Sequence, residues 1–221
     1  MGADLLLLAI DRNLHIVRDR RKVGYAVLGA DLIELAAVGR VEVVRVKRWS
    51  ERIHVTDPQP TGDPLLDASL AALAEARRPP DPADWAQQKL RHGVLEDYLQ
   101  SLSAQEMVRL YPRRITRRIT FTEAALLEPG HQARVQVRAR VDRLAVAGAP
   151  ADAMDWALAG LVYESWLGMG LYPGRVNRDS YRRLKEAARG DRGKGSADPV
   201  DMTIRAAMRA TRYGDNDASS Q

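Results

Sequence analysis

The distribution of hydrophobic and polar positions predicts a chain built mainly from α-helices. Residues 25–38 are apolar on almost every face and end at Gly39, as expected of a nearly fully buried helix closed by a glycine. A shorter apolar stretch covers residues 4–10. Glu34 is the exception within the buried helix. A catalytic role for its carboxylate is conceivable, but an internal hydrogen bond or ion pair is the more common arrangement.

Helical spacing continues along the rest of the chain. Asp63 is well placed as an N-cap with Pro64 at the first helical position, and Leu66, Leu70 and Leu73 then form a buried stripe. The same reasoning predicts further helices over residues 82–102, 131–146, 155–169, 178–189 and 202–213.

Two of these helices have faces of special composition. The helix over 131–146 turns several arginines mostly outward, and such a face is usually solvated; these are Arg134, Arg138 and Arg140. The helix over 155–169 carries aromatic residues at three- and four-residue spacing, which is typical of core packing; these are Trp156, Tyr163 and Trp166. The helix over 178–189 is basic.

Strand signals are few. Residues 41–46 and 53–55 are β-branched runs joined by a basic segment, which predicts a hairpin. Trp49 at its tip suits a membrane interface, base stacking or an ordinary exposed turn. Residues 110–121 pair apolar and basic residues around a proline, and we interpret them as a second hairpin or an extended loop.

A segment rich in glycine and charged residues near the C-terminus indicates where the folded domain ends. We expect one mainly α-helical domain over residues 1–189, a flexible linker over 190–200, a helix over 201–213 and a disordered polar tail over 214–221. No stretch has the ~20 apolar residues of a membrane span, and the opening stretch is too short for a secretory signal. Any membrane contact is therefore expected to be peripheral.

Composition narrows the possible chemistry. The chain contains no cysteine, which excludes disulfides and thiolate sites and suits a reducing cytoplasm. Its net charge is +5, and 29 of its 34 basic residues are arginine. Arginine recognises phosphate through paired hydrogen bonds, but a GC-rich genome also favours arginine codons. The basic excess alone does not identify a partner.

No enzymatic motif emerges from the sequence. The four histidines are scattered without carboxylates at metal-ligand spacing, and the chain has no nucleophile-elbow, dinucleotide-binding or Walker pattern. We therefore expect a protein that is not an enzyme and that needs no cofactor or metal.

Three ordered stretches resemble the Golgi phosphoprotein 3 family, which occurs in eukaryotes and in many actinobacteria. They are the apolar opening at residues 5–11, the helix ending in Gly-Arg at 32–40, and the Pro-Thr-Gly-Asp-Pro-Leu-Leu-Asp segment at 60–67. Their order and spacing match the family from residue 4 to about residue 105. The chain looks like a bacterial, actinobacterial member.

This resemblance implies a fold and a set of partners. The fold is a single domain with a central helix bundle wrapped by amphipathic helices and small hairpins. Eukaryotic members bind phosphatidylinositol 4-phosphate at a basic pocket, bind the cytosolic tails of membrane enzymes, and oligomerise or insert into membranes through a hairpin that corresponds to residues 107–119. We accordingly expect a cytoplasmic, peripherally membrane-associated protein. The resemblance is compatible with a monomer and with a homo-oligomer.

The family's pocket carries over only in part. One basic position matches at Arg91, whereas the family tryptophan falls on Asp19 and two further basic positions fall on Leu28 and Val94. Four basic residues crowd the region beside Asp19. The predicted headgroup-binding residues are Arg91, Arg18, Arg20, Arg21 and Lys22. The predicted membrane or oligomer contacts are Leu110, Tyr111, Arg113, Arg114, Arg117, Arg118 and Trp49.

Three functions are compatible with these patterns. The first is a peripheral membrane adaptor that binds an anionic phospholipid or phosphoinositide headgroup and partner proteins. The second is a nucleic-acid-binding protein with Arg-rich surfaces, which no recognition motif supports. The third is an enzyme that reuses the fold. The adaptor is favoured because it alone draws on the family resemblance.

Overall fold

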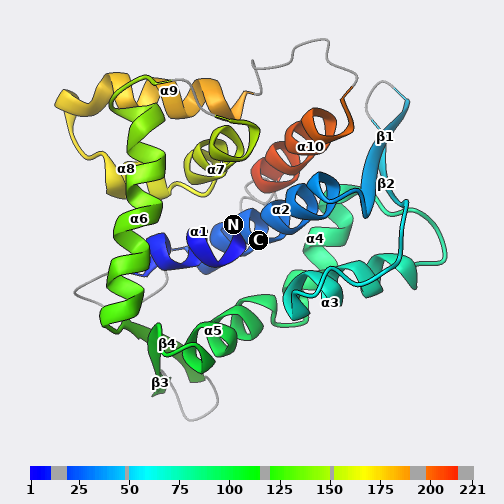
Figure 1. Cartoon of the computed structure of the whole chain (residues 1–221), viewed down its shortest axis with the longest axis horizontal. Coiled ribbons are helices and arrows are strands. Elements are labelled where there is room, and N and C mark those ends of the chain that lie inside the picture. The colour runs from blue at the N-terminus through cyan, green and yellow to red at the C-terminus, as the bar shows by residue number, and fades with distance from the viewer. Residues whose placement is uncertain (11–18, 48–49, 115–119, 150–151, 190–197, 214–221) are drawn as a thin grey trace.

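The computed structural model of the chain describes residues 1–10, 19–47, 50–114, 120–149, 152–189 and 198–213. These residues form a mainly α-helical domain with two separate antiparallel strand pairs, as the sequence predicted (Figure 1). The elements are α1 (Gly2–Ala9), α2 (Arg20–Ala37), β1 (Val41–Lys47), β2 (Ser50–Val55), α3 (Pro64–Ala74), α4 (Pro82–Arg91), α5 (Val94–Ala104), β3 (Val108–Arg114), β4 (Thr120–Leu126), α6 (Glu128–Ala145), α7 (Ala153–Glu164), α8 (Leu167–Leu171), the 3-10 helix η1 (Arg175–Asn177), α9 (Arg178–Ala188) and α10 (Pro199–Tyr213).

Helix α2 is the centre of the molecule. It runs through the middle of the view in Figure 1 and packs against α1, α7 and α10. Because its residues are apolar or small on nearly every face, neighbours can cover it all round, and Leu28, Leu32 and Ile33 are completely or almost completely buried. The predicted buried helix is thus confirmed. It begins earlier than predicted because the Asp19 side chain accepts a hydrogen bond from the Lys22 amide at 3.2 Å.

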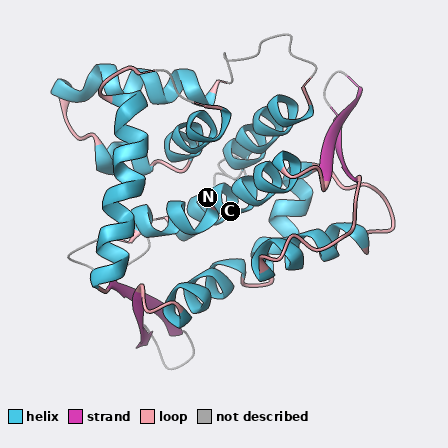
Figure 2. Cartoon of the chain, in the orientation of Figure 1, coloured by secondary structure: helices cyan, strands magenta, loops and turns pink. Residues whose placement is uncertain are grey.

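The two strand pairs lie at opposite corners of the helical body (Figure 2). The predicted hairpin is confirmed as β1–β2, in which Val43 pairs with Ile53 and both side chains are buried. The segment that the sequence left open as a hairpin or a loop forms β3–β4, with Tyr111 opposite Glu123.

Helix α3 begins as predicted. The Asp63 side chain accepts hydrogen bonds from the amides of Leu65 and Leu66 at 2.8 and 3.3 Å, with Pro64 at the first position. The entry loop is fixed from the other side by Asp67, whose carboxylate accepts from the Thr61 amide and hydroxyl at 2.6 and 2.8 Å. These hydrogen bonds lower the pKa of Asp67.

One predicted helix is divided in the structure. The continuous helix expected over residues 82–102 is wrong: α4 ends at Arg91 and α5 starts at Val94. The break lies at Gly93, whose φ of +85° is in the left-handed region that favours glycine. The apolar periodicity continues through the break and therefore concealed it.

A second predicted helix, over residues 155–169, is also divided. Helix α7 ends at Glu164, and Trp166 adopts a φ of +62° before the short helix α8. The prediction that Trp166 belongs to the core is wrong, because 49% of the residue is exposed. Trp156 and Tyr163 are partly buried and pack against the core, as their spacing indicated.

The C-terminal helix α10 is an integral part of the core. It begins at Pro199 and packs along α2, so that Ala206, Ala207 and Met208 are buried. The predicted linker lies mostly outside the described residues, as does the predicted tail over 214–221.

Candidate functional site

The first basic turn of α2 lies beside the connection between α4 and α5. Arg20 and Arg21 line a small hollow of about 200 Å³ together with Leu90, Leu95 and Glu96. The elements approach closely because Gly24 has no side chain: a Cβ there would come within 2.3 Å of the Leu90 Cδ1 atom. An apolar floor and a basic rim are thereby brought together from three helices.

Arg20 connects this hollow to the β3–β4 hairpin. Its guanidinium forms an ion pair with Glu96 and donates a hydrogen bond to the carbonyl of Thr122 in β4 at 3.0 Å. The hairpin predicted to contact membranes or a second subunit therefore lies next to the predicted headgroup residues.

Arg91 is exposed at the last turn of α4, one residue beyond the hollow's Leu90. Within the described part of the chain, its guanidinium has no hydrogen-bond or ion-pair partner. The nearby carboxylate of Glu96 pairs with Arg20 instead. Arg91 is thus available to an incoming anion.

Lys22 faces a different side of α2 from the hollow. The residue is 5% exposed, and its ammonium nitrogen lies 3.0 Å from the centroid of the Trp166 ring. The sequence did not predict that Trp166 contacts Lys22. The three-residue spacing between Tyr163 and Trp166 indicated a core position for the tryptophan instead. Arg18, the remaining predicted headgroup residue, lies outside the described residues.

The predicted membrane or oligomer contacts are only partly described. Leu110 is half-buried and packs against the core, whereas Tyr111 is exposed on β3. Arg113 and Arg114 are placed on β3 by their backbone alone. Arg117, Arg118 and Trp49 lie outside the described residues.

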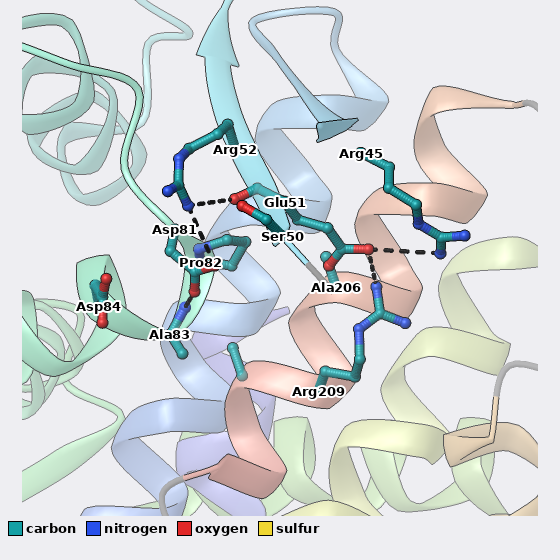
Figure 3. A pocket seen from close by; sticks show the side chains of 11 residues that line it. Arg45, Ser50, Glu51, Arg52, Asp81, Pro82, Ala83, Asp84, Ala206 and Arg209 are labelled. Carbon is teal, nitrogen blue, oxygen red and sulfur yellow. Dashed lines mark hydrogen bonds and ion pairs between the residues drawn. The ribbon is translucent and has the colours of Figure 1, made fainter. Parts of the chain in front are cut away.

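A larger groove of about 660 Å³ lies between the β1–β2 hairpin, the start of α4 and α10 (Figure 3). Its charged side chains mostly neutralise one another: Glu51 pairs with Arg45 at 3.7 Å and with Arg209. Arg52 lies 3.5 Å from Asp81. With its three arginines balanced by three acidic residues, this groove offers no net attraction for an anion.

The one strongly perturbed carboxyl group among the described residues is inaccessible. Asp31 in α2 is fully buried and accepts hydrogen bonds from the hydroxyls of Ser69 at 2.7 Å and Tyr98 at 2.5 Å. Burial raises the pKa of Asp31 to about 7, against the effect of both hydrogen bonds. Through these two hydrogen bonds, Asp31 connects α2 to α3 and α5. Because its carboxyl group is fully buried, no substrate can reach it.

The described residues contain no group of three or more His, Cys, Asp or Glu side chains placed to hold a metal ion. None of the helices in this part of the chain is long and apolar enough to cross a membrane.

Comparison with known proteins identifies the family. No curated protein matches the chain significantly. The family model described as Golgi phosphoprotein 3 (GPP34) matches residues 1–210, which include every described helix and strand except the end of α10. The match extends well beyond the segments that carried the sequence resemblance. The chain belongs to the Golgi phosphoprotein 3 family.

Proposed function

We propose that this protein is a peripheral membrane adaptor, and not an enzyme, that binds an anionic or phosphorylated lipid headgroup and partner proteins such as the tails of membrane proteins. The headgroup binds at the basic corner, which we define as Arg20, Arg21 and Arg91. The observation that carries the proposal is that Arg20 and Arg21 line one hollow, with the exposed Arg91 next to its Leu90, in a member of this family.

The electrostatics of the basic corner favour an anion. The N-terminus of an α-helix carries a partial positive charge, so basic side chains in the first turn of α2 are disfavoured unless an anion is bound. Asp19 compensates in part by capping the helix. A headgroup phosphate would supply the remaining negative charge and accept paired hydrogen bonds from guanidinium groups.

The ion pair between Arg20 and Glu96 is not an obstacle to a ligand. The Glu96 side chain is 49% exposed and the Arg20 side chain 22%, so water partly screens this ion pair and it contributes on the order of 1 kcal/mol. A phosphate can therefore replace Glu96 at little cost. Its binding would leave the β3–β4 hairpin near the bilayer, because Arg20 also contacts Thr122.

The test is the double substitution Arg20→Ala with Arg91→Ala. We expect its binding to phosphatidylcholine vesicles containing phosphatidylinositol 4-phosphate to weaken at least tenfold, or ~1.4 kcal/mol, in cosedimentation. The matched control is Arg77→Ala with Arg78→Ala, which removes the same charge from an exposed loop. Equal binding by the two double variants, both folded by circular dichroism, would exclude the basic corner as the headgroup site.

A further inference from the structure

Helix α9 presents a basic stripe to solvent. Arg178, Arg182, Lys185 and Arg189 are exposed and follow one another at intervals of four, three and four residues. This spacing places them on one helix face, along about 16 Å of its axis. The stripe is separate from the basic corner.

The opposite face of α9 fixes the orientation of this stripe. Leu184 and Ala187 are completely buried, and the Tyr181 ring packs against Tyr163 at a centroid distance of 5.1 Å. Arg183 is turned inward, where its guanidinium donates to the carbonyls of Ala145 and Val146 at 3.0 and 2.8 Å. The stripe therefore cannot turn toward the core without breaking this packing.

Little within the described residues neutralises the stripe. Arg182 pairs with Asp179 at 3.2 Å, but both side chains are mostly exposed and such a pair is weak. Arg178 and Lys185 have no hydrogen-bond or ion-pair partner within the described part of the chain. The surface thus keeps its positive charge available.

An exposed apolar side chain adjoins the stripe. Val176, two residues before Arg178, is 97% exposed. A single exposed valine is common on protein surfaces and by itself requires no partner. Here it lies at the end of a row of exposed positive charges, and an anionic bilayer accepts both at its interface.

We infer that the α9 surface, consisting of Arg178, Arg182, Lys185, Arg189 and Val176, is a second membrane-contact site that binds anionic lipid bilayers without selecting a headgroup. Basic residues are attracted by anionic lipids, and an apolar side chain at the same edge enters the interface. A bilayer offers both features, whereas a nucleic acid offers only the charge. The inference rests on the proposed function in one respect, namely that the chain works at a membrane.

The two sites lie apart in the molecule. Figure 1 shows α9 at one end and the β3–β4 hairpin, which adjoins the basic corner, at the other. Substitutions at one site should therefore leave the other intact, which allows each to be tested alone.

The charge test uses Arg178→Glu with Lys185→Glu, and vesicles of phosphatidylcholine with phosphatidylglycerol. We expect binding to fall at least tenfold, and wild-type binding to weaken as salt rises. The control is Arg77→Glu with Arg78→Glu, which makes the same change in net charge. If both variants bind alike, the α9 surface is not the contact. If the α9 variant loses affinity for a random DNA duplex but not for vesicles, the partner is a nucleic acid and the inference is overturned.

The apolar test compares Val176→Asp with Val38→Asp, since Val38 is also well exposed but lies at the far end of α2. Only Val176→Asp should weaken vesicle binding, at least threefold. Equal binding by the two variants would contradict insertion at Val176.

The two proposals fail differently. Loss of binding in the Arg20/Arg91 variant alone supports the headgroup site and overturns the α9 inference. If only the α9 variant loses binding, measured on vesicles without phosphatidylinositol 4-phosphate, the α9 inference is supported. The basic corner is then rejected, because the Arg20/Arg91 variant binds as the wild type does. A wild-type chain that binds neither vesicle overturns both.

Discussion

Helices α6 and α9 are both rich in arginine, yet their basic side chains do different work. On α6, Arg140 bonds to Asp155 at 2.9 Å and to Asp4 at 3.0 Å, and Arg138 bonds to Asp142 at 2.9 Å. On α9, the exposed stripe has one weak partner, Asp179. The same residue type therefore joins helices in one region and leaves charge available in the other.

The difference arises from what lies opposite each helix. Helix α6 packs against α1 and α7, which supply Asp4 and Asp155 at its edge. Helix α9 turns its stripe away from all the described helices. The expectation that Arg134, Arg138 and Arg140 form a solvated face was therefore wrong: they are half-buried, and Arg134 donates to the Ile10 carbonyl.

A buried carboxylate without a bonded cation gives the largest expected effect. The pKa of Asp31 is about 7 in the folded protein against 3.8 in the unfolded chain, so the folded state binds more protons between these values. The free energy of unfolding should therefore fall as pH rises from about 4 to 8, by on the order of 4 kcal/mol from this group.

Asp31→Asn removes this titration. In urea unfolding, the wild type should lose stability relative to the variant as the pH is raised through 7. The Ser69→Ala variant is a control that weakens one hydrogen bond to Asp31 but keeps the carboxyl group. A difference between wild type and Asp31→Asn that stays constant from pH 4.5 to 8 would show that Asp31 does not titrate in this range.

Asp155 gives the next largest effect, because two arginines of α6 depend on it. Burial tends to raise the pKa of Asp155, but hydrogen bonds from Arg143 and Arg140 lower it below its usual value. Asp155→Ala leaves the half-buried Arg140 with one carboxylate fewer, and we expect a loss of about 2–3 kcal/mol in the free energy of unfolding at pH 7.

The pH dependence of this loss checks its origin. A carboxyl group with a depressed folded-state pKa stabilises above pH 4, and its contribution disappears as the pH falls through the folded pKa. The cost of Asp155→Ala should therefore shrink in acid. A cost that persists undiminished at pH 3 would mean that the side chain acts through packing alone.

The sequence predicted the fold to the extent that local signals determined it. The cap at Asp63 and the β-branched runs of β1 and β2 were sufficient for their elements. The breaks at Gly93 and Trp166 were missed because apolar periodicity continues across both, and the path of the chain is decided there by tertiary packing. Helix propensity disfavours Gly93 by about 1 kcal/mol relative to alanine, but it gives no warning of the break at Trp166.

The sequence predicted the location of the candidate site but not the direction of each side chain in it. Placing Arg20 and Arg21 near the α4 helix followed from the family resemblance, and the structure brings both to Leu90. The contact of Lys22 with Trp166 could not be predicted, because the two residues are 144 positions apart and meet only in the folded chain. The expectation that Glu34 forms an internal ion pair is confirmed, because its carboxylate pairs with the amino group of Met1 at 2.8 Å. The fully buried carboxyl group of the same helix, that of Asp31, was not predicted.

The smallest expected effect concerns the stability of α9 variants. Arg178→Ala with Lys185→Ala should change the free energy of unfolding by no more than about 0.5 kcal/mol, because both side chains are exposed and neither has a bonded partner within the described residues. Arg183→Ala on the same helix removes the two hydrogen bonds to Ala145 and Val146 and should cost about 1–2 kcal/mol. Urea unfolding of the two variants measures both values. Similar losses in both would mean that the stripe is part of the structural framework, as the arginines of α6 are, and that its charge is not held in reserve for a partner.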